Sequence, residues 1–196
     1  MRSILVIGAG AAVVFLAACG HTATVPAKQL GDLVLHPGDL PAQFTAFYVG
    51  PQVRLDTAGT PRANPARFGR KGGWIARYHR PGTFGTRGPL VLDSGVDVFG
   101  DADGAKQDLS AYRALFAETA ASGGPGAKAI SVPRIGDEAI GMTNRQIGPH
   151  PVRFFVIAWR FRNATAAVGA NGFEGKVTLA EVVRLARRQQ QRLASD

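Results

Sequence analysis

The side chains that could do chemistry in this chain of 196 residues are few and widely spaced. One cysteine, Cys19, offers a thiol, and four histidines could serve as bases or metal ligands: His21, His36, His79 and His150. No two histidines lie three or four residues apart, and no serine lies in a Gly-x-Ser-x-Gly turn. Asp137 and Glu138 are adjacent, so on a strand they would point to opposite faces and could not act as a pair. The sequence therefore predicts no catalytic residue, no metal site and no cofactor.

The surroundings of Cys19 give that thiol a different role. A basic start, Arg2, is followed by the apolar run 4–18, which is shorter than the ~20 residues of a membrane-spanning helix. The stretch Leu16-Ala17-Ala18-Cys19 resembles the lipobox of bacterial lipoproteins. That resemblance implies that residues 1–18 are a signal peptide, that Cys19 carries lipid after cleavage, and that the protein is held at the extracytoplasmic face of the cell membrane. A plain secretory signal cut near Ala18 is the alternative.

The composition of the chain that follows the predicted signal peptide is typical of one packed domain. Hydrophobic residues make up 45% of the chain, and a single cysteine cannot form an intramolecular disulfide, so packing alone must hold the fold. We expect residues 19–35, which show little periodicity, to be the lipidated cysteine and a tether. Residues 36–196 are expected to form a single domain.

Positive charge is concentrated in one region of a chain whose net charge is +9. Eight basic residues and one acidic residue lie between Arg54 and Arg87, partly in the proline- and glycine-rich segment 51–73, which is predicted to be an exposed loop. Contact with anionic lipid or an anionic envelope polymer is predicted for three of them: Arg67, Arg70 and Lys71. The alternative is a genomic bias toward arginine on a solvated surface. Outside the cytoplasm, nucleic acid is not an expected partner.

Residue patterns predict an α+β fold. Alternating or β-branched stretches predict strands at 74–79, 90–99, 152–161 and 164–170, with further strand-like residues up to 146. Gly95 indicates a bulge, and Arg162-Asn163 a hairpin turn in which asparagine takes a positive φ. Apolar stripes predict helices over 102–121 and after Thr178. Short links imply an antiparallel sheet of about five strands with two main helices packed on one face.

Several short stretches of the domain carry a family resemblance: Asp39-Leu40-Pro41, the Trp74 strand, Val96-Asp97-Val98-Phe99, Ile135-Gly136-Asp137-Glu138-Ala139, and the apolar hairpin before the last helix. Together they resemble uncharacterised actinobacterial-type lipoproteins and, more distantly, the extracytoplasmic sensor domains of bacterial serine/threonine kinases. Those kinase domains generally carry disulfides, which this chain cannot form. The resemblance implies no particular activity, ligand or site residue.

Three functions are compatible with these observations. The first is a non-enzymatic binding, sensing or adaptor module of the cell envelope, with a protein partner that the sequence does not name. The second is a carrier of lipid or another apolar ligand, which requires an apolar cavity between sheet and helices. The third is a hydrolase of envelope polymers, which requires a cleft with two converging ionisable groups.

Overall fold

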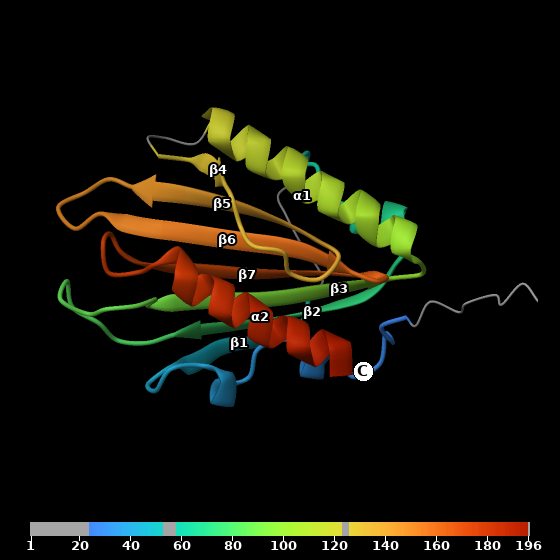
Figure 1. Cartoon of the computed structure of the whole chain (residues 1–196), viewed down its shortest axis with the longest axis horizontal. Coiled ribbons are helices and arrows are strands. Elements are labelled where there is room, and N and C mark those ends of the chain that lie inside the picture. Colours follow the sequence, from blue (N-terminus) through green and yellow to red (C-terminus); the bar gives the residue numbers. More distant parts are fainter. Residues whose placement is uncertain (1–23, 53–57, 123–125, 196) are drawn as a thin grey trace, which may run out of the picture.

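The computed structural model describes residues 24–52, 58–122 and 126–195. Cys19 and the predicted signal peptide, residues 1–18, lie outside this part. The described chain forms one antiparallel sheet in the order β1-β2-β3-β7-β6-β5-β4 (Figure 1). Its strands are β1 Thr45–Pro51, β2 Arg70–His79, β3 Val91–Phe99, β4 Lys128–Ile130, β5 Glu138–Gln146, β6 Val152–Phe161 and β7 Ala164–Phe173. The α-helices are α1 Ala102–Ser122 and α2 Leu179–Ser195, and short 3-10 helices are η1 Leu30–Leu33, η2 Pro37–Asp39 and η3 Pro65–Phe68.

The antiparallel α+β prediction is confirmed, but the sheet has seven strands where about five were expected. The edge strand β1 was missed because its residues are almost all exposed, which leaves no alternation of apolar and polar positions to detect. The other edge strand, β4, has only three residues, too few for a period to show. Neither α-helix, nor any other helix in the described residues, is long and apolar enough to cross a membrane.

The two helices lie on opposite faces of the sheet, and the prediction that both pack on one face was wrong. On β3, Ser94 Oγ donates a hydrogen bond to Gln189 of α2 at 2.9 Å. Asp97 lies three positions further along, so its side chain points to the other face. Its partner on β7, Thr165, donates to Asp108 of α1 at 2.6 Å. The face of β3 that carries Asp93, Gly95 and Asp97 is the one that lies beneath α1.

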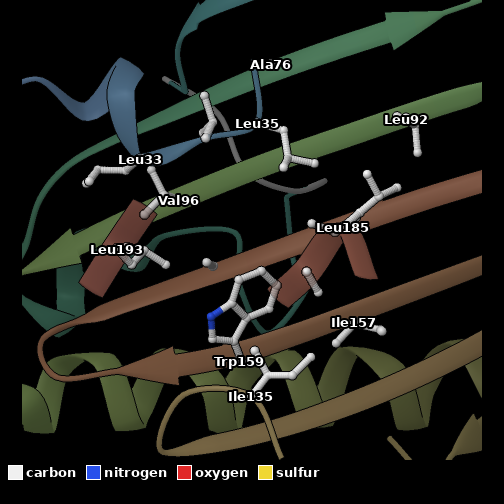
Figure 2. Packing of buried hydrophobic residues seen from close by; sticks show 14 of the residues in the cluster. Leu33, Leu35, Ala76, Leu92, Val96, Ile135, Ile157, Trp159, Leu185 and Leu193 are labelled. Atoms are coloured by element: carbon white, nitrogen blue, oxygen red, sulfur yellow. The ribbon is translucent and has the colours of Figure 1, made fainter. Parts of the chain in front are cut away.

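The larger hydrophobic core lies between the sheet and α2. Trp159 and Ile157 of β6 are fully buried there, in one cluster with Leu185 and Leu193 of α2 (Figure 2). Leu33 and Leu35, from the segment before β1, fill the same layer at 0% exposure. Burying side chains of this size contributes about 1.5–3 kcal/mol each.

The predicted tether is therefore wrong for residues 25–35. Val25 is 1% exposed, and Leu35 N donates to Ser94 Oγ at 2.9 Å. Tyr78 of β2 donates to the Leu35 carbonyl at 2.7 Å. The segment shows no periodicity because its one regular element, η1, is a single short turn; the consecutive apolar side chains Leu33, Val34 and Leu35 cover the sheet.

Two local predictions also need correction. In the β6–β7 turn the positive φ, 53°, falls on Arg162 and not on Asn163, whose side chain donates to the Val25 and Phe99 carbonyls. Gly95 sits in unbroken register between Ile75 and Ala167, so it marks no bulge. The shifts in register lie on β1 between Ala46 and Tyr48, and on β2 between Arg70 and Gly72.

Candidate functional site

A cleft of about 290 Å³ lies between α1 and the sheet face opposite α2. Strands β2, β3, β5, β6 and β7 line one side of it, and α1 supplies the other. The wall is mixed: Gln52, Arg62, Tyr112 and Thr119 add polar groups to its apolar side chains, which are Ile75, Leu115, Phe116, Met142, Val156 and Ala167. The cleft is thus set inside the fold, between two layers.

Two glycines leave the floor of this cleft bare. Gly95 of β3 and Gly169 of β7 lie on neighbouring strands and both line it. A Cβ placed on Gly169 would come no closer than 3.7 Å to any neighbour, and one on Gly95 no closer than 3.5 Å. Side chains could therefore fit at both positions. Glycine inside a strand weakens it and often marks a bulge, a bend, or the close approach of a ligand or another backbone. The register is unbroken at both glycines, so the space above them is the feature that suggests binding.

Arg77 and Asp93 form a half-exposed ion pair in the cleft. Arg77 Nε lies 3.4 Å from Asp93 Oδ1, and both side chains are about half exposed, at 48% and 47%. Partial burial raises the pKa of Asp93, and the Arg77 guanidinium opposes that rise. Ligand groups entering here would meet one cation and one anion that solvent can reach.

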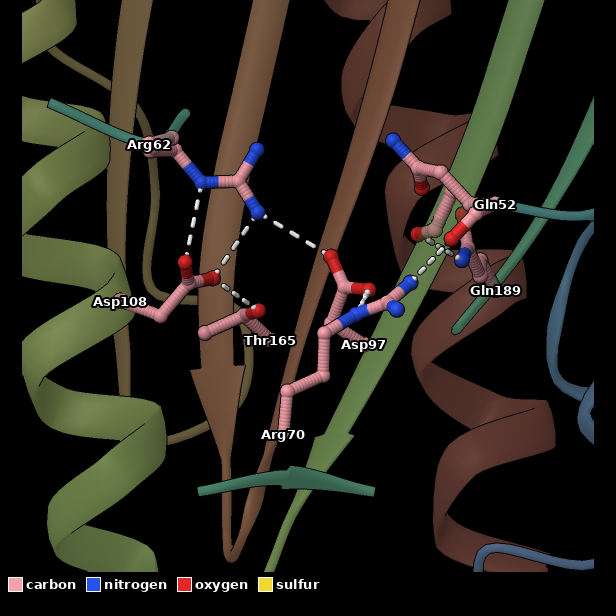
Figure 3. A network of polar contacts seen from close by, with 8 residues as sticks. Gln52, Arg62, Arg70, Asp97, Asp108, Thr165 and Gln189 are labelled. Carbon is pink, nitrogen blue, oxygen red and sulfur yellow. Dashed lines mark hydrogen bonds and ion pairs between the residues drawn. The ribbon is translucent and has the colours of Figure 1, made fainter. Parts of the chain in front are cut away.

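The opposite end of the cleft is closed by a buried charge network (Figure 3). Arg62 donates two hydrogen bonds of 3.0 Å to Asp108 of α1 and one of 3.1 Å to Asp97 of β3. Arg70 donates to the other oxygen of Asp97 at 2.5 Å and to the Gln52 carbonyl at 2.6 Å. The side chains of Arg62, Asp97 and Asp108 are at most 3% exposed.

The buried arginines and aspartates of this network stay charged, because each has a partner of opposite charge within hydrogen-bond distance. Burial alone would lower the pKa of Arg62, but the attraction of Tyr112, Asp108 and Asp97 outweighs burial and raises it. The guanidinium also lies 3.4 Å from the centre of the Tyr112 ring, a cation–π distance. Burial raises the pKa of Asp97, although Arg70 and Arg62 counteract it. A network of this kind fixes the position of α1 over the sheet.

The three basic residues predicted to contact anions are not equivalent. Arg67 is exposed and donates to the Pro61 carbonyl at 2.7 Å, and Lys71 is exposed on β2. Arg70, in contrast, is only 15% exposed and is committed to Asp97, so its prediction as a surface contact was wrong. The other predicted site, the lipid on Cys19, lies outside the described residues.

The positions of two acidic residues in the sequence indicate the buried network, although it was not predicted. Arg62 falls in the segment 51–73, which was predicted to be an exposed loop, and it is 2% exposed. Asp97 is flanked by two core valines in a strong strand, and Asp108 lies on the apolar stripe of α1. A carboxylate on a buried position requires a cation, and the nearby basic segment is the obvious source.

Other hollows of the surface make weaker candidates. A groove of about 510 Å³ separates η2 from α2, but the charged side chains along it, such as Arg184, Arg187 and Arg188, are exposed. Within the described ranges, no group of three or more histidine, cysteine, aspartate or glutamate side chains is placed to hold a metal ion.

Comparison with known proteins places the fold. No protein-family model and no curated protein matches the sequence. The structure is similar to the crystal structure of the extracellular domain of PknH from Mycobacterium tuberculosis, with a TM-score of 0.63 and 12% sequence identity. The match covers 89% of this chain and 99% of that one. At this identity the likeness shows the fold alone, and it confirms at that level the expected resemblance to a kinase sensor domain.

Proposed function

We propose that this chain is a membrane-anchored extracytoplasmic module that binds a small ligand in the cleft beneath α1 and does not transform it. The anchor is the lipid expected on Cys19. The fold shared with the extracellular domain of a kinase supports an extracytoplasmic, sensing role.

The observation that carries the proposal is the open floor at Gly95 and Gly169. A closed core would place side chains there, and the sheet would be stronger for it. With the apolar side chains of its wall and one exposed ion pair, Arg77 and Asp93, the cleft suits a compact ligand with an apolar body and a polar end. Its volume lies near the lower limit of about 300–1,000 Å³ for small-molecule sites, which favours such a ligand over an extended lipid.

The ionisable groups of the cleft support binding more than hydrolysis. Among its described lining residues Asp93 is the one carboxylate, and it faces Arg77. Asp97 and Asp108 are engaged by arginines and support α1. The lipid-carrier alternative needs a larger apolar space than this cleft offers.

Native mass spectrometry of the protein extracted from its own envelope tests this proposal. Gly169→Ile should fill the cleft without a backbone clash, because its Cβ would make ordinary van der Waals contacts with the Asp93 and Val156 side chains, at 3.7 Å and 4.0 Å. The unaltered protein should carry extra mass from a small molecule, and Gly169→Ile should carry none. Gly148→Val, in the exposed β5–β6 turn where a Cβ meets nothing within 4 Å, is the matched control and should retain the ligand. Equal ligand occupancy in both variants would place the ligand elsewhere.

A further inference from the structure

We infer that the domain rests on the membrane by one defined end, formed by the β6–β7 turn, the end of β3 and the start of β2. The occupant of this surface is a bilayer with anionic headgroups. The inference rests on the proposed lipid anchor at Cys19 and adds the orientation that the fold imposes on it.

The chain that leads to the anchor is clamped at this end. Val25 N donates to Asn163 Oδ1 at 2.7 Å, and Asn163 Nδ2 donates back to the Val25 carbonyl at 3.1 Å. The same amide donates to the Phe99 carbonyl at 2.9 Å. All three bonds are buried, and Val25 is 1% exposed. The point where the described chain approaches Cys19 is thus held at the β6–β7 turn.

The remaining distance to the lipid is short. Six peptide units separate Cys19 from Val25, and they span at most about 21 Å when fully extended. The ten-residue strands β2, β6 and β7 are longer, at about 33 Å. The β6–β7 end therefore stays nearest the bilayer, while the β5–β6 turn at the other end of those strands points away from it.

This end also presents exposed positive charge. Gly100 N donates to the Gly69 carbonyl at 3.0 Å, which brings Arg67 and Lys71 beside the end of β3. Two nearby acids have partners: Asp101 accepts from Gly104 N at 2.8 Å, and Asp137 accepts from Arg160 at 2.8 Å. A third, Asp103 in the first turn of α1, is exposed beside Arg67. Arg67 and Lys71, two of the three basic residues predicted to contact anions, therefore lie at the end of the domain that would face the bilayer.

The orientation also places the cleft. Its buried network at Asp97 lies toward the anchored end of β3, and its half-exposed pair of Arg77 and Asp93 lies toward the other end. Ligand would then enter from the side away from the bilayer. Figure 1 shows the end of the sheet that would face the bilayer: the β6–β7 turn lies there, on the same side as the C-terminal end of α2.

Energy transfer to labelled lipid headgroups tests the orientation on the full lipoprotein. Because Cys19 is acylated, a cysteine introduced at Ala66, beside Arg67, or at Gly148, in the β5–β6 turn, is the one free thiol for a donor dye. Both positions are exposed. In liposomes that contain phosphatidylglycerol, transfer from Ala66→Cys should be at least twice that from Gly148→Cys. Inserting fifteen Gly/Ser residues after Thr22 should bring the ratio toward one.

The outcomes separate this inference from the anchor itself. Equal transfer from the two sites, with lipid on Cys19 verified by mass spectrometry, overturns the orientation and leaves the anchor intact. A Cys19 without lipid overturns both. In neutral phosphatidylcholine liposomes the ratio should fall but stay above one; an identical ratio in both lipids overturns the headgroup contact of Arg67 and Lys71.

Discussion

Arg62 and Asp108 form a buried ion pair joined by two hydrogen bonds of 3.0 Å, one from each of two guanidinium nitrogens. Arg62 comes from the segment between β1 and β2, and Asp108 from the second turn of α1. The pair therefore joins two parts of the chain that are 46 residues apart. It holds α1 at the height above the sheet that leaves the cleft open.

Replacing one partner of this pair should destabilise the fold strongly. Asp108→Asn keeps the shape of the side chain but leaves the buried Arg62 charge undercompensated, which costs about 3–5 kcal/mol in buried pairs. Urea denaturation of the chain lacking residues 1–19 measures the loss. Arg113→Gln removes one side of the exposed pair with Glu138 and should cost below about 1 kcal/mol. Similar losses from the two variants would contradict the structural role of Arg62.

Residues 24–35 should be essential to folding, because they are core and not tether. A chain that begins at residue 24 should unfold at the same temperature as one that begins at residue 20. A chain that begins at residue 36 loses Val25, Leu33 and Leu35, and each such deletion typically costs about 2–5 kcal/mol. Thermal unfolding followed by circular dichroism should show no cooperative transition for that chain. A cooperative melting curve for the chain that begins at residue 36 would show that residues 24–35 are a tether and not part of the core.

The strands and helices with strong periodicity could be predicted from the sequence, and the charge network could not. Val152–Phe161 and the stripe of α1 are set by local side-chain pattern. The side of the sheet that each helix covers depends instead on the crossover from β3 to the far edge at β4, which no local pattern encodes. Arg62 was misassigned because an arginine among prolines and glycines has the composition of a surface loop, whatever it contacts.

Stable membrane attachment should require the lipid on Cys19, because headgroup contacts of Arg67 and Lys71 orient the domain but do not anchor it. Cys19→Ala removes the acceptor of the lipid, and no described helix can span the bilayer. Fractionation of the producing cell should move the variant from the membrane to the soluble fraction. Cys19→Ala protein that stays quantitatively in the membrane fraction would rule out the lipid anchor.

The Asp93 carboxyl should titrate above its ordinary value of 3.8, because partial burial raises its pKa. Arg77→Gln removes the opposing cation and should raise the pKa of Asp93 further. Since the folded-state pKa lies above the unfolded one, the contribution of Asp93 to stability is greatest below pH 3.8 and declines as pH rises through the folded-state value. Carboxyl ¹³C NMR measures the titration, and Arg113→Gln should leave it unchanged. A titration of Asp93 at or below pH 3.8 would contradict the burial.

The most direct test of the binding site uses Met142, which lines the cleft and is 9% exposed. The chain has two methionines, and removal of residues 1–18 leaves Met142 as the only one. Mature protein labelled with ¹³C-methyl methionine should thus give a single methyl signal. Addition of a small-molecule extract of the native envelope should shift this signal in the unaltered protein and leave it in place in Gly169→Ile. A signal that stays fixed in the unaltered protein, or that shifts equally in both, would contradict ligand binding beneath α1.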